Sequence, residues 1–213
     1  MRALISAVVL IFASLPVTGA LPVIAQTAPP AAAATPAGSY FPLSVGATWV
    51  RRNDDGAEVT IKVLGTKTVA GAGCTILETR TTGRLGAVRV CYEQTSDGVR
   101  ALETQGLGIT LVLDPPRPTL ELPPQAGRSW SWTPKNVPFS MTVTDTWVLE
   151  ESIRVPAGSF TAWKLQSIAK RGSTTATVTT WYAPGVGPVK VVREENGERD
   201  SEGSSELVSY RFP

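Results

Sequence analysis

Short segments in which apolar and polar residues alternate, separated by turn signals, constrain the fold of this chain most. In residues 57–65, Val59, Ile61 and Val63 would share one face of an extended strand. The other clear cases are residues 139–149 and 206–212. Turn signals recur at 55–56, 82–83, 97–98, 106, 171–172 and 196–197. The pattern predicts an all-β fold, either a curved antiparallel meander or a half-barrel.

The order of the motifs predicts that one β-module occurs twice in tandem. YFPLSVGATW near the start and LPPQAGRSW in the middle share Pro-x-x-x-Gly-x-[Ser/Thr]-Trp, which relates Trp49 to Trp130. Further on, Tyr92 and Tyr182 each precede a glycine-containing corner. We therefore expect two repeats, over residues 40–104 and 119–192, followed by a final strand over 206–212.

The amino-terminal 25 residues are typical of a secretory signal peptide. A basic start, an apolar run and small residues around Ala25 predict cleavage after that residue, with Ala20 as the second choice. The alternative is an uncleaved membrane anchor, although Pro16 and Pro22 interrupt the apolar stretch. Cleavage implies an exported protein, which would be periplasmic, at the cell surface or extracellular.

Residues 26–39 are rich in Ala, Pro and Thr, with almost nothing to bury. Such a composition predicts a disordered linker. The β domain would then occupy residues 40–213. Within it, the proline-rich segment 113–124 is incompatible with a central strand and predicts an extended strap along the sheet. A polyproline ligand for a protein partner is the alternative.

The two cysteines, Cys74 and Cys91, are expected to form a disulfide, as pairs in exported proteins usually do. If Thr82-Gly83 is a two-residue turn, the two cysteines lie directly opposite each other on neighbouring strands. The absence of a Cys-x-x-Cys motif disfavours a redox or metal-binding role.

Five of the six tryptophans follow residue 118, so the second repeat carries a large apolar load. Two interpretations remain open, core packing and the lining of a ligand site. The candidate ligand-binding residues are Trp132, Trp147, Trp163 and Trp181.

The sequence offers little for catalysis. It contains no histidine, and its Glu150-Glu151 and Glu194-Glu195 pairs would point to opposite faces of a strand. Its 20 Lys and Arg against 18 Asp and Glu are scattered, which disfavours nucleic-acid binding. We expect no enzyme, no cofactor, no metal site and no stable transmembrane span. An enzyme assembled from distant residues is the alternative.

Three motifs resemble those of a group of exported bacterial β-rich proteins without assigned function. They are YFPLSVGATW, VPAGSFTAWKL and WYAPGVGPVKV. The resemblance implies a curved antiparallel sheet similar to the half-barrels of periplasmic lipoprotein carriers. It supplies no catalytic residues. Cys74 and Cys91 depart from the second repeat, where the corresponding residues are Ala162 and Trp181.

Two functions fit these observations. The first is a non-enzymatic binding protein whose tryptophan-rich sheet face holds a lipid or another apolar or amphipathic small molecule. The second is a structural or interaction protein of the cell envelope, with the tryptophans as core and an envelope protein as partner. A concave apolar face favours the first, and complete burial of the tryptophans favours the second.

Export makes a direct prediction about the mature chain. The intact mass of the protein recovered from its host should lack residues 1–25. A mature species that retains Met1 or Arg2 would contradict cleavage and favour the anchor.

Overall fold

The computed structural model describes residues 40–137 and 140–213, which form one sheet of 12 antiparallel strands. The strands are β1 (Thr48–Asn53), β2 (Glu58–Val69), β3 (Ala72–Thr81), β4 (Val88–Thr95), β5 (Gly98–Gly106), β6 (Ile109–Glu121), β7 (Ser129–Trp132), β8 (Thr142–Val155), β9 (Gly158–Arg171), β10 (Thr174–Ala183), β11 (Gly187–Glu195) and β12 (Glu198–Arg211). The all-β class is confirmed. The described part of the chain contains no helix that could cross a lipid bilayer.

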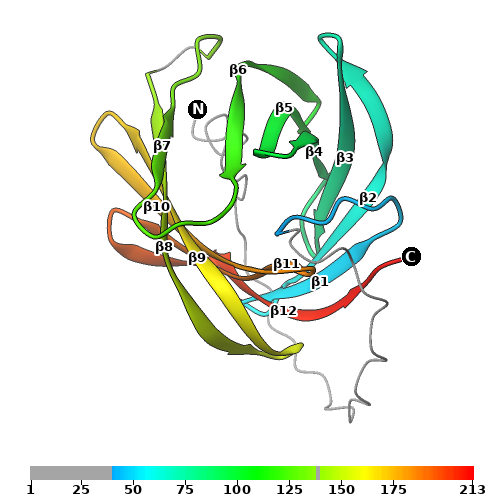
Figure 1. Cartoon of the computed structure of the whole chain (residues 1–213), viewed down its shortest axis with the longest axis vertical. Coiled ribbons are helices and arrows are strands. Elements are labelled where there is room, and N and C mark those ends of the chain that lie inside the picture. The colour runs from blue at the N-terminus through cyan, green and yellow to red at the C-terminus, as the bar shows by residue number, and fades with distance from the viewer. Residues whose placement is uncertain (1–39, 138–139) are drawn as a thin grey trace.

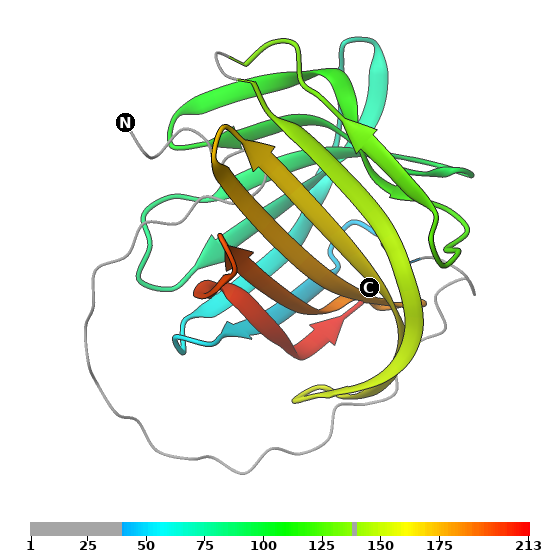
Figure 2. The ribbon, with the colours of Figure 1, turned by 90° about the vertical axis from the view of Figure 1, so that its left-hand side faces the viewer.

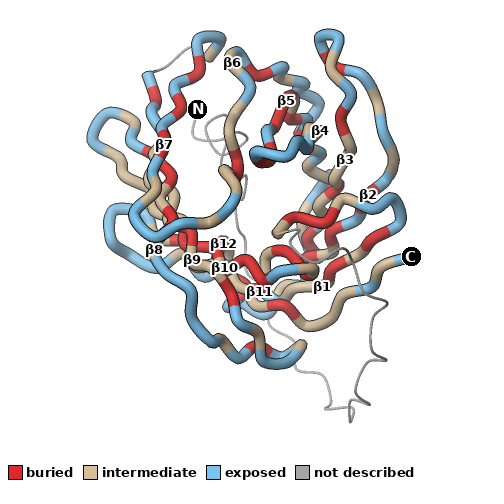
Figure 3. The backbone as a smooth tube through the Cα atoms, viewed as in Figure 1, coloured by how far each residue is buried: buried red, intermediate tan, exposed pale blue. Residues whose placement is uncertain are grey.

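The strands follow one another around a nearly closed barrel (Figures 1 and 2). Each strand pairs with its sequence neighbours, except that β12 pairs with β1 and the sheet ends at β6 and β7. The predicted meander is therefore confirmed, and its two edges are consecutive strands in the middle of the chain. Figure 3 shows exposed residues gathered at the hairpin ends and buried residues along the strands between them.

The boundary between β6 and the β7–β8 pair, here called the seam, has no backbone ladder among the described strands. Pro115, Pro116 and Pro118 in β6 lack an N–H, so this strand cannot donate a regular ladder to β7. The predicted strap is thus an edge strand that pairs only with β5. The proline carbonyls still need hydrogen-bond donors.

Three indole N–H groups supply donors across the seam. Trp130 Nε1 donates to the Pro118 carbonyl at 3.1 Å, and Trp132 Nε1 donates to the Pro115 carbonyl at 2.8 Å. Trp147 Nε1 donates to the Glu121 carbonyl at 2.7 Å. Since a buried unpaired carbonyl is costly, these side chains replace the missing backbone donors.

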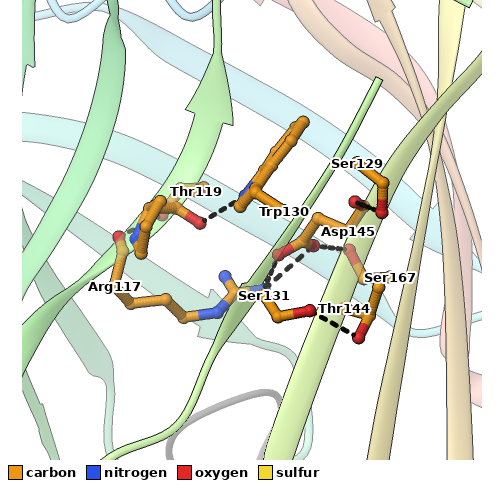
Figure 4. A network of polar contacts seen from close by, with 9 residues as sticks. Arg117, Thr119, Ser129, Trp130, Ser131, Thr144, Asp145 and Ser167 are labelled. Atoms are coloured by element: carbon orange, nitrogen blue, oxygen red, sulfur yellow. Dashed lines mark hydrogen bonds and ion pairs between the residues drawn. The ribbon is translucent and has the colours of Figure 1, made fainter. Parts of the chain in front are cut away.

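An ion pair crosses the seam beside Trp130 (Figure 4). Arg117 Nη2 of β6 lies 3.2 Å from Asp145 Oδ1 of β8, and Asp145 is fully buried. Ser167 of β9 donates a further hydrogen bond to the same carboxylate. Burial raises the pKa of the Asp145 carboxyl, while Arg117 and Ser167 oppose that shift. This pair is the reason that the inward-facing Asp145 interrupts the apolar face expected for residues 139–149.

Three of the register shifts in the sheet recur at matching places in the two halves of the chain. The shifts of the first half lie between Val63 and Gly65, Cys91 and Tyr92, and Ala101 and Glu103, and those of the second between Trp147 and Leu149, Trp181 and Tyr182, and Val191 and Arg193. Tyr92 and Tyr182 both directly follow a shift. The tandem duplication remains a proposal, and these matched irregularities support it.

The structure joins Cys74 and Cys91 in the expected disulfide, with 5.5 Å between their Cα atoms. The predicted register was wrong, because Cys91 lies opposite Ile76 rather than Cys74. The connection from β3 to β4 spans residues 82–87, so Thr82-Gly83 is only part of it. The two cysteines are therefore diagonal neighbours.

The final strand is longer than expected. β12 starts at Glu198 rather than at residue 206, and a register shift opposite Val191 and Arg193 divides it. A second shift, opposite Val50 and Arg51, falls within the expected segment 206–212, and Leu207 rather than Val208 is its buried residue. The expected signal peptide and linker, residues 1–39, lie outside the described residues.

The seam yields a stability prediction. Trp147→Phe should lower the free energy of unfolding by about 1–3 kcal/mol, because the Glu121 carbonyl loses its donor. Trp181→Phe is the matched control, since that indole donates to the exposed Glu151 carboxylate, which water can solvate. Urea denaturation measures both. Equal losses in the two variants would contradict a special role for the seam.

Candidate binding cavity

A cavity of about 290 Å³ lies inside the barrel and is lined chiefly by the first half of the chain. Strands β1 to β6 contribute most of the wall, and β10 to β12 and the segment before β1 contribute the remainder. Its apolar wall includes Trp49, Val59, Ile61, Leu77, Val88 and Val90. Its polar lining includes Arg51, Asn53, Thr104, Arg117, Thr119 and Thr180. A mostly apolar wall with a few polar groups is the usual composition of a small-molecule site.

Strand alternation selects these side chains. In β1, Trp49, Arg51 and Asn53 face the cavity, two residues apart. In β10, Thr180 and Tyr182 face it in the same way. The indole of Trp49 donates to the Val186 carbonyl at 2.7 Å, which fixes the ring in place.

The segment that precedes β1 forms one end of the cavity. Phe41 and Pro42 line it, and the Phe41 ring lies edge-on to Tyr92 with 5.0 Å between centroids. Gly187, in the Pro-Gly-x-Gly corner, has a φ of +93° and would place an added Cβ 3.3 Å from Pro42 Cδ. A glycine is needed there both for this backbone conformation and for the close approach of Pro42.

Arg51 is the unusual residue of the cavity. Its Nε is buried without a hydrogen-bond partner, and no ion pair joins its guanidinium to any described residue. Burial lowers the pKa of Arg51 to about 10, and only the nearby Tyr182 and Tyr92 oppose that shift. The wall therefore holds a cation with no anion beside it, which destabilises the folded state.

The other charged groups of the cavity wall are paired. Arg117 is bound to Asp145 across the seam, and Glu202 lies 2.9 Å from Arg84. Among the described lining residues, Arg51 is thus the charge that no opposite charge compensates. An unpaired positive charge in the wall attracts an anion more than a cation or a neutral group.

Tyr92 and Tyr182 place two phenols near Arg51. Burial raises the pKa of both hydroxyls, with Arg51 and Arg117 opposing the shift. Both phenols are therefore neutral at physiological pH and can donate a hydrogen bond. The cavity combines one cation, two phenolic donors and an apolar wall.

The four candidate tryptophans lie elsewhere than the cavity wall. Trp132 and Trp147 are buried, and their N–H groups are used at the seam. Trp163 is partly buried, with its ring 6.2 Å from that of Trp147. The structure thus brings Trp147 and Trp163 together next to the seam, in the part of the barrel interior that indole rings fill.

Trp181 lies on the opposite face of β10 from Tyr182. Its indole donates to Glu151 at 2.7 Å, and Lys164 and Lys190 lie 5.4 and 5.8 Å from its ring centroid. Whether any of the four tryptophans contacts a ligand remains a prediction. The only tryptophan of the described cavity wall is Trp49.

Sequence reasoning missed Arg51. The signal was present in TWVRRN, where alternation places a charged residue on the same face as Trp49 and Asn53. Tyr92 and Tyr182 were noticed as markers of the repeat, but not as lining residues.

Comparison with known proteins gives a family likeness for the second half of the chain. The model of the DUF3108-like family matches residues 120–210. Two of the three motifs described above, VPAGSFTAWKL and WYAPGVGPVKV, lie within that match. No curated protein matches the sequence.

Two solved structures are similar to most of the chain. One is a candidate lipoprotein of Parabacteroides distasonis, 16% identical, and the match covers 81% of this chain and 98% of that one with a TM-score of 0.46. The other is a candidate exported protein with a YmcC-like fold from Bacteroides fragilis, 13% identical, with the same coverage and TM-score.

Because the Arg51 guanidinium is unpaired, we expect it to lower the free energy of unfolding of the protein. The folded-state pKa of Arg51 lies below its unfolded value, so folding disfavours the charged form and stability is lost at neutral pH. Stability returns only as the pH rises through about 10. Arg51→Met should therefore raise the free energy of unfolding by about 1–3 kcal/mol at neutral pH.

The control is Arg52→Met, one residue along the same strand, whose side chain is exposed. Its free energy of unfolding should change by less than about 0.5 kcal/mol. Chemical denaturation of both variants and of the parent protein measures the difference. A large loss of stability in Arg51→Met would show that this guanidinium has a structural partner.

Proposed function

We propose that this chain is an exported, non-enzymatic binding protein whose barrel holds a lipid or another apolar or amphipathic small molecule. The observation that carries the proposal is the cavity of about 290 Å³, with its apolar wall and unpaired cation. A cavity formed only by imperfect packing would be lined by apolar groups, and burying an uncompensated charge in it would be costly. The signal peptide predicted for residues 1–25 supports export.

The binding site in this proposal is the hollow half of the barrel, not the tryptophan-rich half. Trp130, Trp132 and Trp147 are buried, and their indoles serve the seam, so they leave little surface for a ligand. The cavity wall contains Trp49 and mostly aliphatic side chains. A ligand there would contact β1 to β6 and residues of β10 to β12.

The second candidate function is a structural or interaction protein of the cell envelope. It is favoured by the same tryptophans, whose burial and bonding give them a structural role without a ligand. Residues 26–39 would then act as a spacer between the domain and its attachment. In that case the cavity has no ligand and filling it should leave function intact.

A cavity-filling variant separates the two. The protein isolated from its own host is examined by native mass spectrometry, where a retained small molecule appears as added mass. Val90→Trp places a large ring at the cavity wall and should abolish the added mass. Leu149→Trp adds the same ring at an exposed position and should leave it unchanged.

Two results would contradict the proposal, one for binding itself and one for the location of the site. If the parent protein carries no added mass and takes up no fatty acid, phospholipid or carotenoid offered to it, the binding proposal fails. If Val90→Trp retains the ligand as fully as the parent, the ligand lies outside this cavity. Circular dichroism of both variants establishes that the fold is intact.

A further inference from the structure

Resting on the proposed function, we infer that the ligand of this cavity is an amphiphile with a single carboxylate head, held by Arg51, on an apolar body. The cavity brings Arg51, Tyr92 and Tyr182 together on its wall with the aliphatic side chains of β2 to β4. This arrangement provides a recognition element for each part of such a molecule. A long-chain fatty acid is the simplest representative.

The charge of the head follows from Arg51. A guanidinium keeps its proton at neutral pH, so a buried one is stabilised by an anion rather than by deprotonation. Arg51 has no hydrogen bond or ion pair with any described residue, and its Nε is buried without a partner. A bound anion would supply both.

A carboxylate matches the site better than a phosphate. The planar fork of a guanidinium binds the two oxygens of a carboxylate with parallel hydrogen bonds. A doubly charged phosphate needs a second cation, and the other arginine of the wall, Arg117, is already paired with Asp145. One unpaired guanidinium therefore fits one negative charge.

The two phenols complete the polar end. Tyr92 and Tyr182 line the cavity and interact electrostatically with Arg51, and none of the described hydrogen bonds uses either hydroxyl. Neutral phenols can donate to oxygens that the guanidinium leaves unbound. Glu202, the acidic residue of the lining, is paired with Arg84 and so does not neutralise Arg51.

The apolar end is the aliphatic wall. Val59 and Ile61 of β2, Leu77 of β3 and Val90 of β4 face the cavity beside the polar end. Each methylene group of a ligand buried against them contributes about 0.8 kcal/mol. Affinity should therefore rise with chain length until the cavity is filled, whereas the charge of the head should set selectivity.

Calorimetric titration tests head and tail separately. The probes are octanoate, dodecanoate and hexadecanoate, the corresponding alcohols, dodecyl phosphate and dodecyltrimethylammonium. We expect dodecanoate to bind about 10- to 100-fold more tightly than dodecanol, and the quaternary ammonium to bind most weakly. Arg51→Met should remove the preference for the carboxylate and leave the affinity for the alcohol unchanged.

Two further variants complete the design. Arg51→Lys keeps the charge but loses the fork, so the preference should be only partly retained. Arg52→Met is the matched control and should bind as the parent does, because this side chain is exposed. Thermal midpoints measured in parallel establish that every variant is folded.

The outcomes distinguish this inference from the function on which it rests. If acids and alcohols of equal length bind equally, or if Arg51→Met keeps the preference, the cavity binds apolar molecules but the carboxylate inference is overturned. Tighter binding of dodecyl phosphate than of dodecanoate overturns it as well. If no probe of any head or length binds, the proposed function fails together with the inference.

Discussion

The hydrogen bonds between three indoles and the carbonyls of a proline-rich edge strand are the interactions on which the closed form of this sheet depends. A sheet of 12 strands that starts and ends in the middle of the chain has two edges to satisfy, and prolines prevent one of them from donating a ladder. Trp130, Trp132 and Trp147 reach across that gap. Their rings also fill the barrel next to the gap, so closure and packing are provided by the same residues.

Closure by bulky side chains divides the interior into two unlike halves. Next to the seam, Trp147 contacts the rings of Trp130, Trp163, Tyr40 and Tyr182. On the other side, aliphatic residues of β2 to β4 leave space, and Arg51 enters that space from β1. The asymmetry in tryptophan content therefore corresponds to a filled half and a hollow half, and the polar groups that could recognise a ligand lie in the hollow one.

Features that depend on local sequence pattern, such as the strands and the disulfide, were predictable from the sequence. Features that depend on closure of the sheet into a barrel, such as the cavity, were not. Alternation and turn signals were enough for an all-β meander, and two cysteines in a chain expected to be exported were enough for the disulfide. The register of β3 and β4 was wrong because the connection at 82–87 is longer than a two-residue turn. The cavity could not be predicted, because the residues that line it come from nine strands and the segment before β1, and their meeting follows from the curvature of the whole sheet. Arg51 could have been found, since a charge on an apolar strand face is visible in the sequence.

The position of the disulfide is also explained by the difference between the filled and the hollow half of the barrel. Cys91 lies between Val90 and Tyr92, both of which face the cavity, so the bond lies on the opposite face of the hollow half and packs against Val69 and Leu102. The hollow half of the barrel buries less apolar surface than the half filled with indole rings, so burial stabilises it less. A loop of this length closed by a disulfide contributes about 3 kcal/mol without occupying any of the interior. In the proposed duplication the corresponding residues of the second repeat are Ala162, which is buried, and Trp181, which lies on the face of β10 opposite Tyr182. If the two halves descend from one module, the disulfide is the feature that lets one of them stay hollow.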